Sequence, residues 1–459
     1  MRAFLGGRLA PRREVTATDV ERAVPWIVRD ATFAELMNVL TSGTLLCAFA
    51  VALGASNTVV GLIAGIAPLC QVLQLSATAV VETLRARKAM ALVSAVVGRT
   101  MWLAVAGAAL LPVGPGRLAV LLVALGLRAA INSHYICAQN SWMRDLLPDG
   151  SMGDFYARRM RASYLAGMVA GLAGGLMVDL FAKATGHAMH GYAFLFVVAF
   201  VFGEAAVLMA LKVPEPELPP PTGEPLHGRL LAPLRDVNYR RFLAYIASWN
   251  LTSGMAAPLF TIYLLRRLGY PLSWVVVLEA AGKVAHLLTL GLWGRLADRH
   301  SSRSVVAVAQ PFYWVSLLLW PLAGFLGGAT PVTLVVVAAI FIVNRVAAAG
   351  TDIGNATLAM QLAPRGGATS YLAVRSLVMN PASFVAPVLA GALTDLLARV
   401  PVLRAHALDL ALVTAALVGI VSAVLLRRVT QEGASAHRAV LADIAVALTS
   451  RWRDEPGDR

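Results

Sequence analysis

Long apolar runs alternate with short polar segments along most of the chain. Six runs occupy the first half, at about 31–54, 58–81, 89–112, 118–143, 162–182 and 191–211. Six more occupy the second half, at about 242–265, 272–293, 304–325, 331–356, 370–397 and 406–426. A helix of roughly 20 apolar residues crosses the hydrocarbon core of a bilayer. The pattern therefore predicts an all-α membrane protein with twelve transmembrane helices.

Three polar segments frame these runs. Residues 1–30 are basic, and the stretch IVRDATF near their end is compatible with a short interfacial helix. The segment 212–241 contains VPEPELPPPTGEPLHG, whose prolines cannot continue a helix, so we expect a linker there. Residues 427–459 form a polar tail. The predicted domains are thus a six-helix bundle at 31–211 and a second one at 242–426.

Composition supports a membrane protein and argues against several other classes. Hydrophobic residues make up 58% of the chain and charged residues 14%, which a water-soluble domain of this length would not tolerate. The net charge of +14 does not indicate nucleic-acid binding, because the arginines lie between apolar runs rather than on one soluble face. The motifs GxSxG, GxxxxGK[ST] and HExxH are absent, so we expect neither an enzyme nor a bound cofactor. Cysteine and histidine spacings do not suggest a metal site.

The distribution of basic residues predicts an orientation. If the termini and the loops after even-numbered spans lie on one side, that side carries 28 of the 39 Lys and Arg residues, and the opposite loops carry six. Basic residues concentrate in cytoplasmic loops. We therefore expect a multi-pass protein of the plasma membrane, a bacterial inner membrane, with both termini in the cytoplasm. We expect a monomer that contacts the lipid bilayer, a small solute and protons.

The two halves of the sequence repeat each other at a nearly constant offset. Charged and amide residues coincide in order: Glu82 with Asp298, Arg87 with Arg303, Gln139 with Asn355, and Asp179 with Asp395. Lipid-facing residues alone would not keep charges in register. The series indicates a duplication, and so predicts two pseudo-symmetric six-helix bundles.

The stretch GLWGRLADRHSSR, from Gly291 to Arg303, joins two apolar runs and carries a recognisable pattern. It resembles the signature loop of the major facilitator superfamily, roughly GxLaDrxGrr, although Ser301 replaces the second glycine. The resemblance implies secondary transport by alternating access, with a site between two bundles. It implies gating roles for Gly294, Asp298, Arg299 and Arg303, and for Glu82 and Arg87 in the degenerate first copy. The alternative is a solvated basic loop.

A second resemblance lies in NSWMRDLLPDGSMGDFYARRM, from Asn140 to Met160. It looks like the loop between spans four and five in a group of bacterial members whose substrates are mostly unassigned. It therefore supports the family without indicating a solute.

Polar residues within the predicted spans are the candidate solute ligands, because charges inside a bilayer are costly. On the fourth span a helix face is shared by Arg128, Asn132, Tyr135 and Gln139. On the tenth, Arg345 and Asp352 share a face. By resemblance the first, fourth, seventh and tenth spans line the cavity, which adds Asn38, Trp249 and Asn250. Two opposed arginines would attract a carboxylate or phosphate. Structural ion pairs are an equally weighted alternative.

Three further charged residues are candidates for coupling to protons: Glu279, Lys283 and Glu204. A carboxylate that meets a cation in only one conformation can load and release a proton. Static pairing with a neighbouring base is the alternative. Within transport, export of a drug or metabolite and uptake of an organic anion stay open. A receptor or assembly factor on the same scaffold, which binds without flux, is the rival of another class.

Overall fold

Helices account for nearly all regular structure in the part of the chain that is described. The computed structural model describes residues 9, 11–12, 15–146, 152–217, 226–364, 368–431, 440 and 443. Within these ranges some side chains are not described, and that of Glu82 is one of them. The predicted gating role of Glu82 therefore lies outside the described residues.

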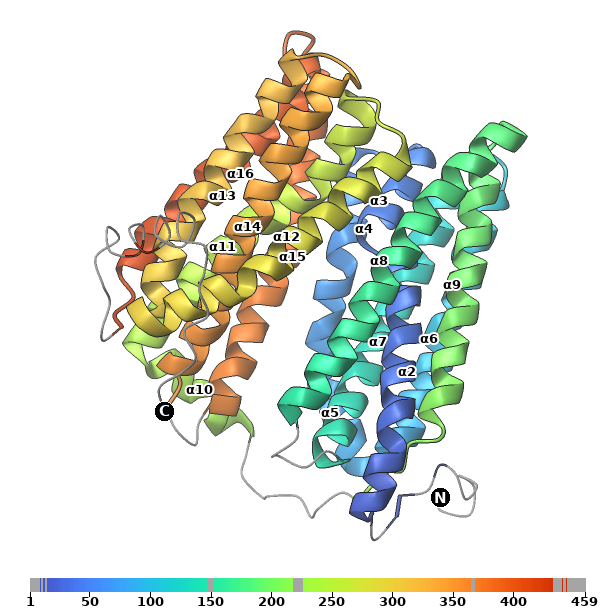
Figure 1. The fold of residues 1–459 in the computed structure, drawn as a ribbon, viewed down its shortest axis with the longest axis vertical. Coiled ribbons are helices and arrows are strands. Elements are labelled where there is room, and N and C mark those ends of the chain that lie inside the picture. Colours follow the sequence, from blue (N-terminus) through green and yellow to red (C-terminus); the bar gives the residue numbers. More distant parts are fainter. Residues whose placement is uncertain are drawn as a thin grey trace. The chain divides into compact units, whose positions relative to one another are not determined.

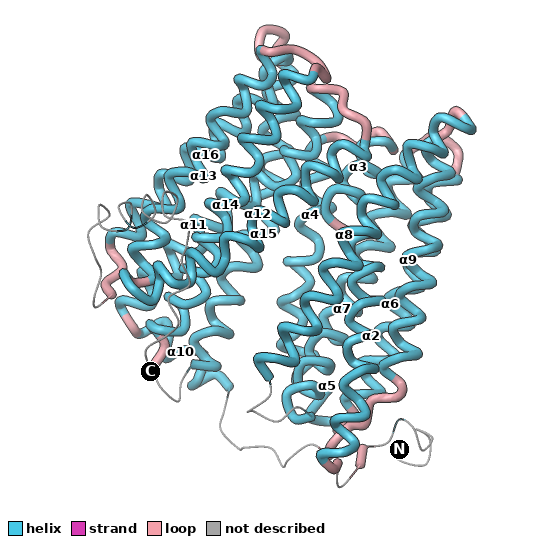
Figure 2. The backbone as a smooth tube through the Cα atoms, viewed as in Figure 1, coloured by secondary structure: helices cyan, strands magenta, loops and turns pink. Residues whose placement is uncertain are grey.

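The helices follow the order that the apolar runs predict (Figure 1). In the first half they are α2 (Ala17–Thr41), α3 (Gly43–Ala52), α4 (Asn57–Cys70), η1 (Gln71–Leu73), α5 (Gln74–Leu84), α6 (Arg87–Leu110), α7 (Pro115–Leu146), α8 (Met152–Thr185) and α9 (Ala188–Ala210). In the second half they are α10 (Leu226–Arg235), α11 (Val237–Ile262), η3 (Tyr263–Arg267), α12 (Leu272–His300), α13 (Ser302–Phe325), α14 (Pro331–Leu362), α15 (Ala368–Arg399), η4 (Arg404–His406) and α16 (Ala407–Arg427). Figure 2 shows the same helices joined by short loops.

Ten of these helical segments in the described ranges are long and apolar enough to cross a membrane, counting α2 and α3 as one. The second predicted span is divided by η1 into α4 and α5, and the seventh corresponds to α11. The predicted all-α membrane fold is confirmed, with ten of its twelve spans meeting the criteria of length and apolarity.

The first span differs from the prediction in where it begins and in being interrupted. Instead of a separate interfacial helix near residue 30, α2 runs unbroken from Ala17, where Thr16 and Asp19 form a capping box. The helix then breaks within the predicted span. Ser42 is extended and Gly43 has a φ of 54°, a conformation that glycine adopts at little cost.

The described contacts divide the chain into two compact units. The first contains residues 1–224 together with 257–280 and 383–399, and the second contains 225–256, 281–382 and 400–459. The first unit thus takes in one end of α11, α12 and α15 as well as the N-terminal helices. The predicted domain boundaries at 211 and 242 stay a prediction.

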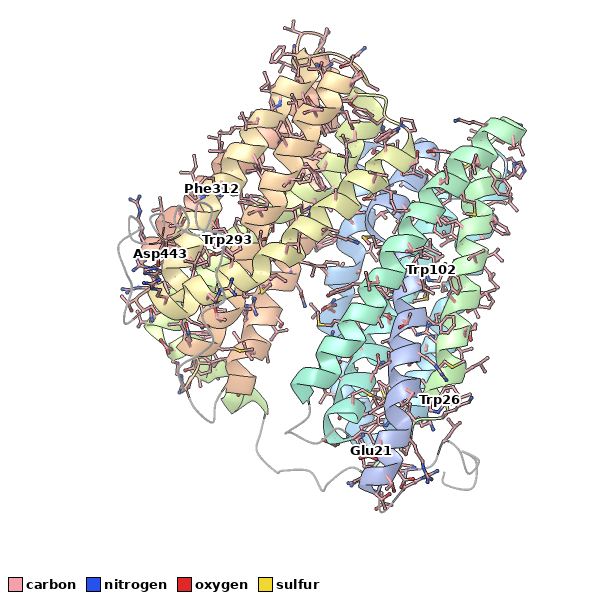
Figure 3. All side chains as sticks on the ribbon, in the orientation of Figure 1. Glu21, Trp26, Trp102, Trp293, Phe312 and Asp443 are labelled. Atoms are coloured by element: carbon pink, nitrogen blue, oxygen red, sulfur yellow. The ribbon has the colours of Figure 1, made fainter. Side chains whose placement is uncertain are left out.

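Aromatic side chains form much of the interior of the first unit. Trp102 on α6 is fully buried and stacks on Phe196 of α9 with ring centroids 5.7 Å apart (Figure 3). Phe49 on α3 meets Phe196 edge-on at 4.9 Å. Gly203 lets α9 approach closely, because a Cβ there would lie 2.7 Å from Met37 Sδ and 2.9 Å from Arg99 Cδ. This packing holds α2, α6 and α9 together around Arg99.

Candidate functional site

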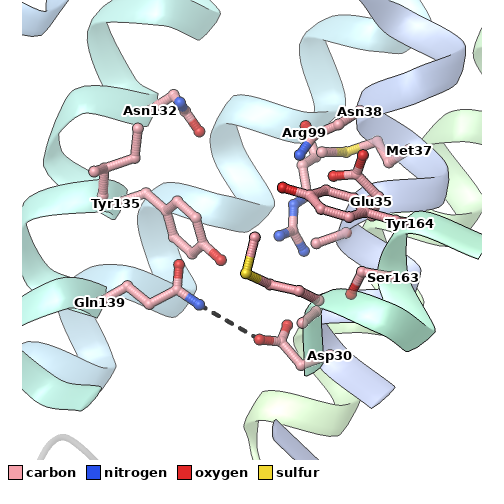
Figure 4. A pocket seen from close by; sticks show the side chains of 14 residues that line it. Asp30, Glu35, Met37, Asn38, Arg99, Asn132, Tyr135, Gln139, Ser163 and Tyr164 are labelled. Carbon is pink, nitrogen blue, oxygen red and sulfur yellow. Dashed lines mark hydrogen bonds between the residues drawn. The ribbon is translucent and has the colours of Figure 1, made fainter. Parts of the chain in front are cut away.

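A polar pocket of about 320 Å³ lies among the membrane-spanning helices of the first unit (Figure 4). Its lining comes from α2, α6, α7 and α8. The polar members are Asp30, Glu35, Asn38, Arg99, Asn132, Tyr135, Gln139, Ser163 and Tyr164. A volume of this size suits a small-molecule ligand.

Two helices, α7 and α2, supply most of the polar groups, because their polar residues recur at helical spacing and so lie on one face. On α7, Asn132, Tyr135 and Gln139 are spaced by three and four residues and so share one face. On α2, Glu35 and Asn38 are three residues apart. Figure 4 shows the α7 residues and the α2 residues on opposite sides of the pocket.

Asp30 closes one end of the pocket. Its side chain is buried, and Gln139 Nε2 donates to its Oδ2 at 3.4 Å. Glu35 lies higher on the same helix, where Gly167 of α8 leaves room for it: a Cβ on Gly167 would be 3.0 Å from Glu35 Cγ. Both carboxylates of α2 therefore lie along one wall.

Arg99 of α6 is buried and reaches the pocket from behind. Its guanidinium donates to the backbone oxygen of Gly203 on α9 and lies 5.5 Å from the ring centroid of Tyr135. Glu204, the next residue on α9, interacts electrostatically with Arg99. Arg99 thus contacts α9 as well as the pocket.

The structure brings Asn38, Asn132 and Tyr135 together in the pocket, as the sequence predicts for solute ligands. Arg128 does not line it. Its guanidinium lies 4.3 Å from the ring centroid of Trp102, on the buried side of α7. Cation–π packing accounts for its place in an apolar helix.

The predicted ligands of the second unit have mainly local contacts. Trp249 is buried and meets Tyr313 edge-on at 5.0 Å, and Asn250 donates to the backbone oxygen of Ile246, one turn before it on α11. Arg345 lies 4.7 Å from the ring centroid of Phe341 on its own helix. Asp352 is exposed and interacts electrostatically with Arg345. Their roles in binding stay predictions.

The coupling candidates occupy different environments. Oε1 of Glu204 is buried and finds no hydrogen-bond partner among the described residues. Glu279 is half-buried in the first unit, and Lys283 is exposed in the second. The side chain of Glu204 is half-buried, like that of Glu279, and it interacts with Arg99, which lines the pocket.

Arg87, a predicted gating residue, is fully buried in a hydrogen-bond network at the end of the first unit that we predict to be cytoplasmic. Its backbone N donates to Glu215 Oε1 at 2.7 Å, and its guanidinium donates to Asp145 and to the backbone oxygens of Ser141 and Pro216. Burial raises the pKa of the Glu215 carboxyl, against the lowering effect of its hydrogen bonds from Arg87 and of that cation. The network ties α6 to α7 and to the start of the linker.

Arg303 repeats this arrangement in the second unit. Its backbone N donates to Gln431 Oε1 at 2.9 Å, and its guanidinium donates to the backbone oxygens of Leu426 and Arg427 at 3.4 and 3.3 Å. The offset that places Arg303 on Arg87 also places Gln431 on Glu215. The sequence repeat is therefore also a repeat of hydrogen bonds.

The other predicted gating residues of the segment Gly291 to Arg303 differ in their contacts. Gly294 faces Ile353 of α14, with space for a Cβ at ordinary contact distance of 3.5 Å. Arg299 pairs with Asp443 at 3.0 Å. The side chain of Asp298 is exposed and forms no hydrogen bond with another of the described residues. Their gating roles stay predictions.

At the opposite end of the first unit, Asp395 of α15 caps the start of α4. Its Oδ1 accepts from the backbone N and from Nδ2 of Asn57 at 3.1 and 2.8 Å. Its Oδ2 accepts from the backbone N and from Oγ1 of Thr58 at 2.8 and 2.6 Å. Arg266 adds donors to Asn57 Oδ1 at 2.7 Å and to the Ala55 oxygen at 2.5 Å. The first N–H groups of α4, which lack acceptors within the helix, are thus satisfied from another helix.

The same contact occurs between α8 and α12. Asp179 Oδ2 accepts from the backbone N of Ser273 at 2.8 Å, in the first turn of α12. The offset of the sequence repeat places Asp395 on Asp179 and Ser273 on Asn57. Glycines permit both approaches, since a Cβ on Gly391 would lie 2.1 Å from the Asn57 oxygen and one on Gly175 would lie 3.0 Å from Cγ2 of Val276 on α12. We call these two contacts the capping junctions.

Several residues of the site were not among the predicted ligands. They are Asp30, Glu35, Arg99, Ser163 and Tyr164. A charge within an apolar run is a visible signal for Arg99 and Glu35. Asp30 was missed because the first span was predicted to begin at residue 31, whereas α2 begins at Ala17.

Comparisons with known proteins support the fold alone. No model of a known protein family matches the sequence, and no curated protein matches it. Solved transporters match the structure over most of both chains. The nucleoside transporter NupG, in a mutant form, has a TM-score of 0.71 at 12% identity, covering 89% of this chain and 100% of that one.

Two further solved structures agree. A bacterial homologue of the human lysosomal transporter Spinster, inward-facing and occupied, has a TM-score of 0.67 at 14% identity, covering 92% of this chain and 100% of that one. A POT family transporter in complex with 5-aminolevulinic acid has a TM-score of 0.62 at 12% identity, covering 92% and 99%. These matches confirm the predicted fold, since the chain has the fold of these solved transporters.

Proposed function

We propose that this protein is a secondary transporter that carries a small solute across the membrane by alternating access, with the polar pocket of the first unit as its solute site. The observation that carries the proposal is the pocket itself. Nine polar side chains from four helices converge on a volume of about 320 Å³ inside segments that are otherwise apolar. The solved transporters with the same fold support the same function.

The cost of polar groups in a bilayer makes a purely structural role a poor account of this pocket. Isolated ion pairs would suffice to hold helices together, and they would leave no space between the partners. Here Glu35, Asn38 and Asn132 border an open volume. A solute that replaces water against these groups gives the polar lining a function.

The break in the first span also supports a solute site. Helices interrupted within the membrane expose backbone groups at the binding sites of secondary transporters. The break at Ser42–Gly43 follows Asn38 by one turn, and Ser42 Oγ donates to the Asn38 oxygen at 2.5 Å. The interruption thus lies next to a residue that lines the pocket.

The capping junctions suit the alternation between two states. They consist of hydrogen bonds and glycine contacts at helix ends, which can part without exposing a large apolar core. Asp395 and Asp179 join helices from both halves of the sequence within the first unit. In the proposed cycle they keep the extracytoplasmic end closed while the other end is open.

The proposal includes coupling to protons and a location. Glu204 is the proposed coupling carboxylate, because an anionic oxygen buried without a donor is costly and protonation removes that cost. Glu279 with Lys283 is the second candidate for this role. The transporter is proposed to act as a monomer in the plasma membrane with both termini in the cytoplasm.

Proteoliposomes that contain the purified full-length protein test the proposal. They are incubated with a cell metabolite extract, and the solutes that accumulate inside are identified by mass spectrometry against protein-free liposomes. The proposal predicts time-dependent accumulation of at least one polar solute, reduced by Asn38→Ala and Asn132→Ala. A solute that stabilises the protein but never enters would instead indicate a receptor.

A further inference from the structure

Two exposed cations meet on one tryptophan ring near the end of the first unit that we predict to be cytoplasmic (Figure 3). Nζ of Lys212 lies 3.5 Å from the ring centroid of Trp26, and the guanidinium carbon of Arg29 lies 4.6 Å from the same centroid. Trp26 is half-buried and packs against a buried cluster that contains Trp142. The ring therefore holds two neighbouring positive charges at the surface.

The carboxylates nearest to these cations in the sequence bind other groups. Asp30 is buried and accepts from Gln139, and Glu215 is buried and accepts from Arg87. In the described part of the chain, neither of the two cations on the tryptophan ring forms a salt bridge. Both can therefore bind an anion from outside the protein without breaking a described ion pair.

An apolar groove of about 590 Å³ lies between α2, α8 and α9 of the same unit. Every residue that lines it is apolar. Leu36 and Leu40 come from α2, and Val198 and Phe202 come from α9. Val169 of α8 also lines the groove and is 65% exposed, so the groove opens on the outer surface of α8. In a bilayer, this surface faces lipid chains.

Helix periodicity and one ring contact connect the cations to the groove. On α2, steps of four, three and four residues place Arg29, Phe33, Leu36 and Leu40 on one face. Phe33 meets Phe202 with ring centroids 6.1 Å apart. This aromatic pair lies between the basic end of the face and the groove. From Arg29 to Leu40 the helix rises about 16 Å, close to the thickness of about 15 Å of the hydrocarbon of one leaflet.

We infer that an anionic phospholipid binds here as a specific ligand, with its phosphate at Arg29 and Lys212 and an acyl chain in the groove. Guanidinium and ammonium groups bind phosphate, and tryptophan is typical of the membrane interface. The excess of anionic lipid in the cytoplasmic leaflet adds to the attraction. A free phosphate would meet the same two cations, but only a lipid also fills the groove. Such a site does not depend on transport.

Native mass spectrometry of the purified full-length protein in detergent tests the inference by counting bound lipid during a titration. The probes are dioleoylphosphatidylglycerol, which is anionic, dioleoylphosphatidylcholine, which has the same chains and no net charge, and inorganic phosphate. We expect the anionic lipid to bind more tightly than the neutral one by at least about tenfold. Inorganic phosphate at the same concentration should not displace it, because phosphate lacks the chain.

Variants of the two cations assign the preference to this place. The double variant Arg29→Gln/Lys212→Gln should bring the affinities for the two lipids to within about twofold of each other. The exchange Arg29→Lys/Lys212→Arg keeps both charges and should keep the preference. The matched control is Lys183→Gln, which removes an exposed cation from the last turn of α8 and should leave the preference as in the wild type. The melting temperature of each variant shows whether it is folded.

A variant of the groove tests the place of the chain. Ala173 lines the groove and is exposed, so Ala173→Phe adds a ring to the groove without entering the core. We expect it to weaken binding of both lipids by at least about fivefold and to leave the preference for the anionic one unchanged. The control is Ala184→Phe, at an exposed residue of the same helix that does not line the groove.

Either half of the site can fail. Equal binding of the two lipids, or a preference that the double glutamine variant keeps, would overturn the proposed binding of the phosphate. If inorganic phosphate displaces the anionic lipid, or if Ala173→Phe binds both lipids as the wild type does, the cations bind a phosphate group alone. That result would also overturn the inferred lipid site.

Discussion

Equivalent residues of the two repeats can have very different burial. Arg87 is fully buried, and its partners include the carboxylates of Asp145 and Glu215. Arg303 is half-buried and bonds to a neutral amide and to backbone oxygens. The repeat thus supplies its own comparison between a charged and a neutral network.

Replacing the two arginines should therefore have unequal effects on stability. Arg87→Ala leaves Glu215 buried without its cation, and we expect a loss of about 3 kcal/mol. Arg303→Ala removes hydrogen bonds to uncharged groups, and we expect about 1 kcal/mol or less. Thermal unfolding of both variants in detergent gives the comparison. Equal losses would mean that the burial of the first network has no energetic consequence.

Glu215 provides a test that depends on pH. Its pKa in the folded protein is raised above the ordinary value of 4.5, chiefly because it is buried. The folded state therefore binds the proton more strongly, and this contribution to stability is lost as the pH rises through the folded pKa. Gln431 shows that glutamine fits the equivalent position. We expect the stability of Glu215→Gln relative to the wild type to increase as the pH is raised from about 4 to about 8. If the difference in stability between the variant and the wild type stays constant or decreases as the pH rises, the pKa of Glu215 is not raised.

The coupling role of Glu204 can be tested in vesicles. Glu204→Gln should abolish accumulation driven by a proton gradient and leave exchange of solute for solute intact, because the neutral amide cannot release a proton. Glu279→Gln is the parallel variant for the second candidate. Accumulation that responds to the gradient as in the wild type would remove the residue from the coupling role.

At the scale of helices, the pattern of apolar residues did not predict the break at Ser42–Gly43 or the capping junctions. The runs predict where helices cross the membrane, since burial in lipid depends on composition. They do not predict which helix satisfies the first N–H groups of another. Asp179 and Asp395 coincide in the sequence repeat, yet their partners Ser273 and Asn57 become visible only in three dimensions.

Weakening one junction should open that end of the protein more often. Asp395→Asn loses the charge that binds the start of α4, and one of its two oxygens becomes an amide donor facing N–H groups. We expect about a tenfold gain in labelling of an introduced Ala55→Cys by a membrane-impermeant thiol reagent. Ala55 is 1% exposed in this structure.

The control for this measurement is Asp409→Asn. Asp409 also lies in the first turn of a helix, but it pairs with His406, three residues before it in the sequence. The variant should leave labelling at position 55 unchanged. If Asp395→Asn labels no faster than the wild type, the junction does not hold this end closed.

At the scale of the whole molecule, the sequence predicts the fold well and the site in part. Apolar runs and the sequence repeat predict the helix order, because both follow from lipid burial and duplication. Asn38, Asn132 and Tyr135 are correctly brought together by helix periodicity on α2 and α7. The direction of an arginine side chain is harder to predict. Helix periodicity places Arg128 on the same face as Asn132 and Tyr135, yet its long side chain turns to the ring of Trp102.

The central claim is that one polar site is exposed to each side of the membrane in turn, and a reversible cross-link across a capping junction tests it most directly. The double variant Thr58→Cys/Asp395→Cys places two thiols where the side chains now share a hydrogen bond of 2.6 Å. Solute accumulation in proteoliposomes is measured before cross-linking, after it, and after reduction. The account predicts that cross-linking stops accumulation and that reduction restores it. Accumulation that continues at the wild-type rate through a fully cross-linked protein would contradict it.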